Sequence, residues 1–460
     1  MTIDREVPRL HAITRPLSGA PDLIGLADPQ EPLLWQRGDR GCVGIGETLR
    51  LAFGGPTRFD DAAEHWRRIA SAAEIDDPLR LPGTGLVALG AFAFADDSSA
   101  ESVLVVPRTL VARHRDVWWV TEIAVIPHPP EAAAGKPATD DPTVGKPAAD
   151  DPAAPALPAP RPPGSWRGTA FDADGEGSRA GRTTTPTAAR DDVAAYLRGV
   201  REAVDRISRG DADKIVVARQ VAGGIDADAD LRIPLRRLAE RYTDCWTFAV
   251  DGMVGASPET LIRSTGGGVS ARVLAGTRGR HPESDERDAQ ARDELLTSAK
   301  EQHEHAFAVQ SVVTALSPHV RELRTSEEPF TLRLPNVWHL ATDLDAVLDE
   351  RSSSLELVGA LHPTAAVAGA PTAAAVRAIA ELEPFDRGRY SGAVGWIDAT
   401  GDGEWVIALR CAQVGPADPA TGKRAVIASA GGGIMAGSDP EHELGETVSK
   451  LRPITEAFAE

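Results

Sequence analysis

The segment GAVGWIDATGDGEWVIALRCAQV (392–414) contains two apolar runs separated by the turn-forming residues ATGDG. Glycine and aspartate in such a turn favour a β-hairpin, and the β-branched and aromatic residues on both sides favour strands. A further apolar run, KRAVIASAGGGI (423–434), predicts another strand after a short loop. The C-terminal part of the chain is therefore expected to be built from antiparallel strands.

The same pattern continues upstream of this hairpin. The runs TFAVDGMVGASPETLIR (247–263) and VSARVLAG (269–276) flank a glycine turn and predict a second hairpin region. Three more strands are predicted near the N-terminus, in GLVALGAFAFA (85–95), SVLVVPRTLVAR (102–113) and DVWWVTEIAVI (116–126).

Helices are predicted between and after these strands. The segment 191–210 has apolar residues at helical spacing, ends at Gly210 and precedes the strand KIVVARQV (214–221). The segment 293–316 predicts one long amphipathic helix, and a last helix is expected to begin near Asp439, a good cap before a proline. Hairpins interleaved with long helices, without a regular βαβ rhythm, indicate an α+β fold with antiparallel sheets and helices outside.

The charge balance excludes several classes of partner. The 460 residues include 68 acidic and 49 basic ones, for a net charge of −19. Nucleic acids and anionic membrane surfaces require a basic face, so neither is an expected partner. An anionic substrate would need local positive charge from a metal ion or from placed lysines and arginines.

Cysteine usage and the N-terminus predict a cytoplasmic protein. Cys42, Cys245 and Cys411 are scattered without a CxxC spacing, which argues against a disulfide framework or a zinc site. The N-terminal sequence MTIDREVPRL lacks the pattern of a signal peptide, and the most apolar run, Leu86–Ala95, is too short to span a bilayer.

A composition break divides the chain. Residues 127–189 are rich in Pro, Ala, Gly and Asp and contain the near-repeat GKPATDDP and GKPAADDP. Such sequence lacks the apolar side chains that offset the entropy of ordering, so most of it is predicted to be a flexible insertion. It separates an N-terminal part of the α/β domain, 1–126, from a motif-bearing core, 190–460.

Two pairs of glutamates have the spacing of a shared helix face. Glu301 and Glu304 lie three residues apart on one predicted helix, and Glu443 and Glu446 do so on another. Together they could hold a hard cation such as Mg²⁺ through oxygen ligands. A solvated acidic face is the commoner role of such residues, and spacing alone leaves both interpretations open.

Three further polar residues lie among apolar neighbours and could take part in a reaction. Lys214 opens a strand; in a desolvated site it could act as a base, whereas at a strand end it would reach solvent. Glu259 is either a turn residue after Pro258 or a carboxyl with a raised pKa that donates a proton. Arg410, among apolar neighbours, needs an internal or a substrate carboxylate.

The glycine cluster SAGGGIMAG (429–437) follows a predicted strand. It fits a dinucleotide-binding fingerprint poorly, because no βαβ unit surrounds it. Two interpretations remain open: a tight turn from strand to helix, or free backbone N–H groups that bind a carboxylate.

At this point the chain, from about Leu197 to Phe458, resembles the chorismate-utilising enzymes, which include isochorismate, salicylate, anthranilate and aminodeoxychorismate synthases. The resemblance is carried, in order, by KIVVAR, GASPETLIR, LAGTRGR, the S-x-K-E-x-x-E-H run at 298–305, PNVWHLAT, the LHPT…G-x-P run at 361–371, IAELEPFDRGRYSGAVGW, GEWVIALRCA and AGGGIMAGSDPEHELGETVSKL. It makes 190–460 the expected chorismate-binding catalytic core.

The resemblance implies a fold of two stacked antiparallel sheets with helices on the outside. It places the family's magnesium ligands on Glu304 and Glu446, with supporting carboxylates at Glu301 and Glu443. Substrate-contacting positions fall on Gly276, Thr277, His339, Ala366, Val367, Arg410, Gly431 and Lys450.

Lys214 and Glu259 decide which reaction the resemblance implies. Lys214 matches the family's water-adding members, in which a neutral lysine deprotonates water that adds at carbon 2 of chorismate. Glu259 falls on the general acid that protonates the hydroxyl leaving carbon 4. Mg²⁺ and Lys450 are expected to hold the ring carboxylate, and Arg410 the enolpyruvyl carboxylate. The implied activity is isochorismate synthase, an isomerase.

Alternatives within and outside this reaction stay open. A salicylate synthase would also eliminate pyruvate, but Ala366 and Val367 in HPTAAVAG are similar to the non-lyase pattern, although Ala365 stands where proline is usual. An amine-using synthase or a non-catalytic chorismate-binding protein are the other candidates. A monomer without a glutaminase subunit is expected. Menaquinone synthesis is the first candidate for the pathway that uses its product, and siderophore synthesis is the second.

Overall fold

The computed structural model describes residues 7–126, 157, 162, 164–169, 171, 193–281, 283–333 and 337–460. For Thr277, Lys300, Glu304 and Val337 it describes the backbone alone. The predicted flexible insertion therefore falls mostly outside the described residues, and its boundaries stay a prediction.

The described strands join into one hydrogen-bonded network in which each pairing is antiparallel, except that of β1 with β4. The strands are β1 (Leu10–Pro16), β2 (Leu33–Arg37), β3 (Arg40–Phe53), β4 (Glu74–Asp76), β5 (Val87–Ala91), β6 (Ser102–His114), β7 (Val117–Val125), β8 (Lys214–Asp226), β9 (Trp246–Val250), β10 (Met253–Ser257), β11 (Thr260–Thr265), β12 (Gly268–Gly279), β13 (Val320–Thr325), β14 (Phe330–Arg333), β15 (Val337–Leu348), β16 (Gly369–Ala370), β17 (Ala393–Asp398), β18 (Gly403–Ile407), β19 (Cys411–Asp418) and β20 (Lys423–Ile434).

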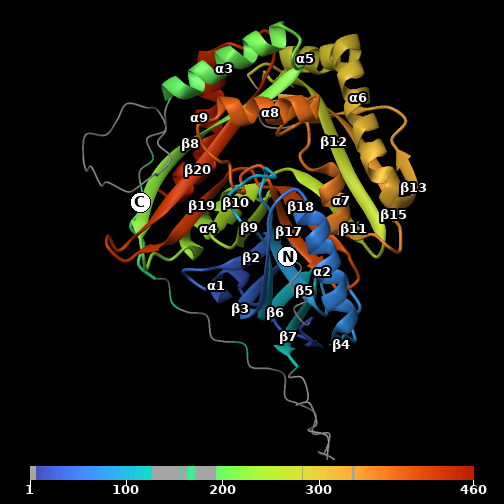
Figure 1. Cartoon of the computed structure of the whole chain (residues 1–460), viewed down its shortest axis with the longest axis vertical. Coiled ribbons are helices and arrows are strands. Elements are labelled where there is room, and N and C mark those ends of the chain that lie inside the picture. The colour runs from blue at the N-terminus through green and yellow to red at the C-terminus, as the bar shows by residue number, and fades with distance from the viewer. Residues whose placement is uncertain are drawn as a thin grey trace, which may run out of the picture.

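Two arms leave the long β3–β6 pair, and we call them the β8 arm and the β12 arm. The β8 arm runs from β3 through β2, β9, β10, β19 and β20 to β8 and β16. The β12 arm runs from β6 through β5, β17, β18, β11 and β12 to β15, and β13 and β14 line the far edge of β15. Figure 1 shows the ends of the two arms on opposite sides of the molecule.

The arms stack on each other through a buried apolar layer. Trp35, Trp246 and Phe248 from the β8 arm share one core cluster with Val394 and Val406 from the β12 arm. The α+β fold of stacked antiparallel sheets is confirmed, with the addition that the two sheets are continuous through β3 and β6.

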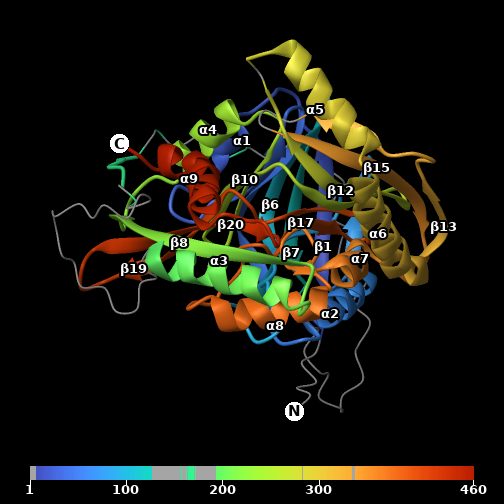
Figure 2. The ribbon, with the colours of Figure 1, turned by 90° about the horizontal axis from the view of Figure 1, so that it is seen from above.

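The helices lie outside these arms. They are α1 (Leu23–Leu26), α2 (Arg58–Ala72), α3 (Val193–Ser208), α4 (Arg232–Arg241), α5 (Asp285–Thr297), α6 (Ala299–Leu316), α7 (Ser354–Leu361), α8 (Thr372–Leu382) and α9 (Pro440–Ala457), with a 3-10 turn at Ser317–His319. Helices α3 and α8 pack on β8 and α9 on β20, whereas α5 and α6 pack on β12, as Figures 1 and 2 show. No helix among the described residues is long and apolar enough to cross a membrane.

Local signals predicted several of these elements correctly. The hairpin of β17 and β18 is confirmed, Gly210 follows α3 with a φ of +84°, and the Asp439 carboxylate accepts the His442 N–H at the start of α9. The single helix predicted for 293–316 was wrong. The helix is interrupted at Ser298, whose hydroxyl caps α6 by accepting the Glu301 N–H.

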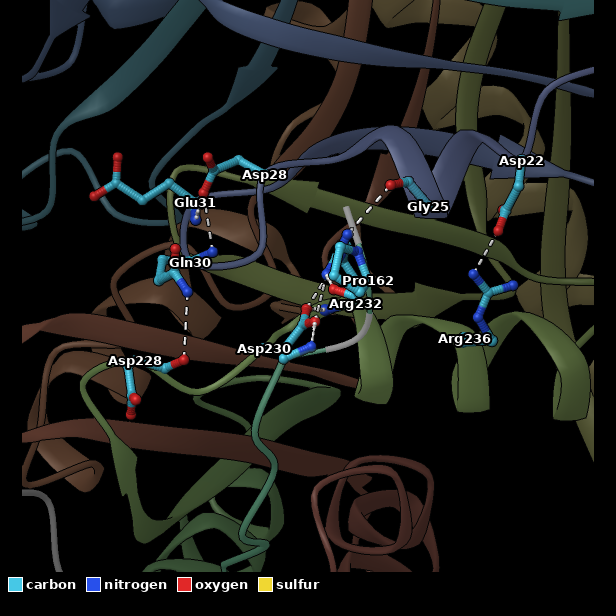
Figure 3. Close-up of polar contacts among 11 residues, drawn as sticks. Asp22, Gly25, Asp28, Gln30, Glu31, Pro162, Asp228, Asp230, Arg232 and Arg236 are labelled. Carbon is cyan, nitrogen blue, oxygen red and sulfur yellow. Dashed lines mark hydrogen bonds and ion pairs between the residues drawn. The ribbon is translucent and has the colours of Figure 1, made fainter. Parts of the chain in front are cut away.

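A short segment within the predicted insertion, at residues 162 and 164–169, contacts the core (Figure 3). The buried Arg232 bonds both carboxylate oxygens of Asp230 and the Pro162 carbonyl, while Asp230 accepts the Gly164 N–H. Trp166 donates to the Ala459 carbonyl. These contacts attach the described residues of this segment to the start of α4 and to the residues after α9.

Candidate active site

Glu259 and Arg410 lie where the chain passes between the two arms. Glu259 joins β10 of the β8 arm to β11 of the β12 arm, and Arg410 joins β18 back to β19. The two crossings are adjacent, since the Glu259 carbonyl accepts the Ile407 N–H at 3.0 Å and the Arg410 carbonyl accepts the Ala256 N–H at 3.1 Å. The prediction of one continuous strand through Arg410 was wrong, because β18 ends at Ile407.

Arg410 has a left-handed backbone, with φ at +49°. For a residue with a Cβ this conformation is strained and persists only where the surroundings enforce it. Burial lowers the pKa of Arg410, and the nearby Tyr390, Cys245, Tyr242 and Glu259 oppose that shift. A guanidinium with little solvent and no described ion pair is suited to bind a carboxylate from outside.

Burial raises the pKa of Glu259, and the charges of Lys214 and Arg410 oppose the rise. The opposing charges show that the three side chains, from separate parts of the chain, are near one another. When Lys214 is neutral its opposition disappears, so the protonated form of Glu259 is favoured further. The protonation states of the two groups are therefore coupled, because the charged form of each favours the charged form of the other.

Lys214 lies over the glycine strand. It is the first residue of β8 and pairs with Ala370 of β16. A Cβ placed at Gly433 would lie 2.5 Å from Cε of Lys214 and 3.2 Å from its Nζ. Gly433 therefore leaves the space that the lysine side chain fills, and the interpretation of Lys214 as a solvent-facing strand end is not favoured.

The glycine cluster belongs to β20 and not to a turn. Gly431, Gly432 and Gly433 pair with β8, while β19 pairs with β20 only as far as Ala428. A Cβ at Gly432 would lie 2.9 Å from Oε2 of Glu443. Both expectations from sequence, a tight turn and N–H groups at a helix start, are corrected to a strand whose bare backbone admits side chains.

Helix α9 brings charged groups to this strand. Lys450 Nζ donates to the Gly431 carbonyl at 3.1 Å and to Oε2 of Glu446 at 2.9 Å. Glu443 is buried and accepts a hydrogen bond from Ser438 at 2.7 Å. Burial and then the charge of Glu446 raise the pKa of Glu443, and Lys450 opposes this. The predicted set of Gly431, Lys450, Glu443 and Glu446 is thus gathered on one surface.

The β12 arm contributes a β-bulge to the site. Gly276, with φ at +78°, interrupts the pairing of β12 with β15. A Cβ there would lie 3.2 Å from Oε2 of Glu301 on α6. Burial lowers the pKa of His339 on β15; a hydrogen bond to the Gly276 backbone opposes this, and the charge of Lys214 adds to it. His339 therefore links Gly276 to the surroundings of Lys214.

Two predicted residues are only partly described. The backbone of Thr277 pairs with His339, and Glu304 lies on α6 one turn beyond Glu301, but their side chains fall outside the description. Within the described side chains, no group of three or more His, Cys, Asp or Glu is arranged to hold a metal ion. The metal-ligand assignment of Glu304 and Glu446 stays a prediction.

Ala366 and Val367 lie in the loop between α7 and β16. Ala366 is exposed, whereas Val367 is 3% exposed and its carbonyl accepts a 2.8 Å bond from Arg387. The loop borders β8, because the Ala368 carbonyl accepts the Val216 N–H. The substrate contacts predicted for this loop are not tested by these distances.

Two buried tyrosines near this site were not predicted. Among the described residues, the Tyr196 hydroxyl on α3 has no hydrogen-bond partner, and it lies 3.8 Å from a Cβ placed at Gly432. Burial raises the pKa of Tyr390 to about 12, with the Arg387 charge opposing. Tyr196 has its polar tip on the apolar face of an amphipathic helix, which is the one sequence signal that would have marked it.

Three basic side chains gather at the site although the chain carries a net charge of −19. Lys214, Arg410 and Lys450 surround it, with a carboxyl at Glu259 whose pKa is raised. The family model described as "chorismate binding enzyme" matches residues 24–134 and 171–459. The chain belongs to the chorismate-binding enzymes.

Similar proteins agree with this assignment. Isochorismate synthase DhbC of Bacillus subtilis is 39% identical over 277 residues, covering 57% of this chain and 67% of that protein. Isochorismate synthase EntC of Escherichia coli is 38% identical over 251 residues, covering 54% and 62%. The structure of the menaquinone-specific isochorismate synthase MenF of Escherichia coli has the same fold, with a TM-score of 0.70, 22% identity and coverage of 99% and 97%. Chorismate-binding enzymes act on a small-molecule substrate.

Proposed function

We propose that this chorismate-binding enzyme is an isochorismate synthase that adds water at carbon 2 of chorismate and expels the hydroxyl from carbon 4. The proposal rests on one observation: the buried carboxyl of Glu259, whose pKa is raised, lies within the influence of Lys214 and Arg410. A base, an acid and an anion holder thus meet in one site. Its relatives named isochorismate synthase support the same reaction.

The two proton transfers balance. Lys214, when neutral, removes a proton from water as its oxygen attacks carbon 2. Protonated Glu259 gives a proton to the oxygen leaving carbon 4, so hydroxide departs as water. The substrate gains and loses one water, and solvent returns both side chains to their starting forms. Each such group typically contributes ~10²–10⁴ in rate.

Substrate positioning is assigned to the cations. Arg410 is proposed to hold the enolpyruvyl carboxylate, because its strained backbone fixes the direction of a guanidinium that lacks a described ion pair. Lys450, already held by the Gly431 carbonyl and Glu446, is proposed to contact the ring carboxylate. Gly276, Thr277 and His339 are proposed to line the same pocket.

Glu443 and Glu446 on α9 supply oxygen atoms of the kind that Mg²⁺ prefers. Burial, and after it the charge of Glu446, raises the pKa of Glu443; a divalent cation would offset the repulsion between the two carboxylates. We propose that Glu446 and Glu304 hold the ion, supported by Glu443 and Glu301. When bound, Mg²⁺ supplies positive charge for the ring carboxylate.

Incubation of the protein with chorismate and Mg²⁺, followed by chromatography, tests the proposal. Isochorismate as the sole product is the expected result. Salicylate with pyruvate would identify a salicylate synthase, and aminated products on addition of ammonia or glutamine would identify an amine-using enzyme. Binding of chorismate without any product would identify a non-catalytic protein.

A further inference from the structure

A buried ion pair outside the reacting groups contacts the strand that carries Lys214. Arg387 and Glu383 are joined by two hydrogen bonds of 2.6 and 2.8 Å, and both side chains are 2% exposed. Removing an ion pair of this kind from water costs free energy, so stability alone does not explain its buried position.

The pair bonds the free edge of β8. β20 pairs with one edge of β8, and on the other edge the β16 ladder ends at Ile215. Beyond that point, the Val216 carbonyl accepts a 2.9 Å bond from Arg387, and Glu383 accepts the Ala218 N–H at 2.8 Å. The two side chains thus take the place of a strand partner from the Val216 carbonyl to the Ala218 N–H.

The same guanidinium holds the loop between α7 and β16. Arg387 donates to the Val367 carbonyl at 2.8 Å and lies 4.5 Å from the centre of the Phe94 ring. Phe94 in turn accepts, at its carbonyl, a 3.1 Å bond from His362 at the start of that loop. One residue therefore bonds both the Lys214 strand and the loop beside it.

We propose that Glu383 and Arg387 are positioning residues that fix the backbone of Lys214 relative to the 362–368 loop, and so set the direction from which the base approaches water. This inference rests on the proposed role of Lys214. Arginine is required because its planar fork reaches two carbonyls and a carboxylate at once, which a lysine ammonium does not. The pair touches no reacting atom.

The test compares Arg387→Lys and Glu383→Gln with a matched control, Arg389→Lys. Arg389 is also buried and bonds the Glu101 carbonyl and Asp251, but in the described contacts it does not touch β8. Because small displacements of a catalytic group cost up to ~10² in rate, we expect kcat to fall about tenfold or more in the two variants. KM for chorismate and the kcat of Arg389→Lys should stay close to wild type.

Hydrogen exchange separates this inference from the proposed function. Amides of 214–218 and 364–369 should exchange faster in Arg387→Lys and Glu383→Gln than in Arg389→Lys, whether or not the protein turns over chorismate. Equal exchange in all three variants would overturn the proposal. A kcat in Arg387→Lys and Glu383→Gln equal to that of Arg389→Lys would also overturn it, as would parallel changes of kcat and KM. An inactive wild type would instead overturn the proposed function. If Arg387→Lys does not fold, the isosteric Glu383→Gln variant decides.

Discussion

The two arms present the site with very different support. On the β8 arm, Lys214 lies against a bare glycine strand, and the ion pair that bonds β8 is 2% exposed. On the β12 arm, ion pairs such as Arg272–Asp343 and Arg278–Glu294 are exposed by 41–45%, and β13 is largely solvent-facing. Buried backbone and packing therefore fix the reacting group of the β8 arm, whereas these two pairs of the β12 arm are surface contacts that contribute less to stability.

The most severe test of the comparison is Lys214→Gln. Loss of the base should lower kcat for isochorismate formation by ~10³–10⁴, at the upper end of what one proton-transfer group contributes. Chorismate binding, measured by calorimetry, should remain because Arg410 and Lys450 are intact. Unchanged turnover would remove Lys214 from its role.

Glu259→Gln should cost somewhat less, ~10²–10³ in kcat, since the amide still donates a hydrogen bond but no proton. In the wild type the acid works only when protonated. Because burial raises its pKa, this contribution extends to higher pH than for an ordinary glutamate and is lost as pH rises through that pKa. The rate profile measured with saturating chorismate should show this falling limb, and Glu259→Gln should lack it.

Gly433→Ala tests packing without removing a reacting group. The new methyl would meet Cε of Lys214 at 2.5 Å and displace it, which should lower kcat by about tenfold. Gly437→Ala is the control, because no atom lies within 4 Å of its Cβ position. Equal kcat in the two variants would show that Lys214 does not depend on the bare strand.

Arg272→Ala should have the smallest effect. Its ion pair with Asp343 is about half exposed, and pairs of this kind contribute roughly 0.2–1 kcal/mol to the free energy of unfolding. Urea unfolding should therefore show a small loss of stability with kcat unchanged. A marked loss of kcat would contradict the proposed contrast between the arms.

Local patterns in the amino-acid sequence predicted several elements and the identities of the candidate residues. The ATGDG turn predicted the β17–β18 hairpin, and Asp439 predicted the start of α9, because turns and caps depend on neighbours in the chain. The ordered blocks around Lys214, Glu259 and Arg410 predicted the family. They did not show that Ser298 divides the helix predicted for 293–316, since a weak cap competes there with a continuous apolar pattern.

The way in which these residues meet depends on tertiary packing. The left-handed Arg410 at an arm crossing, the space that Gly433 leaves for Lys214 and the bonds of Arg387 to Val216 and Val367 all join segments far apart in sequence. Each depends on which strand edges and backbone carbonyls are left without a ladder partner once the arms have paired. That property arises from packing of the whole chain and has no local pattern in the sequence.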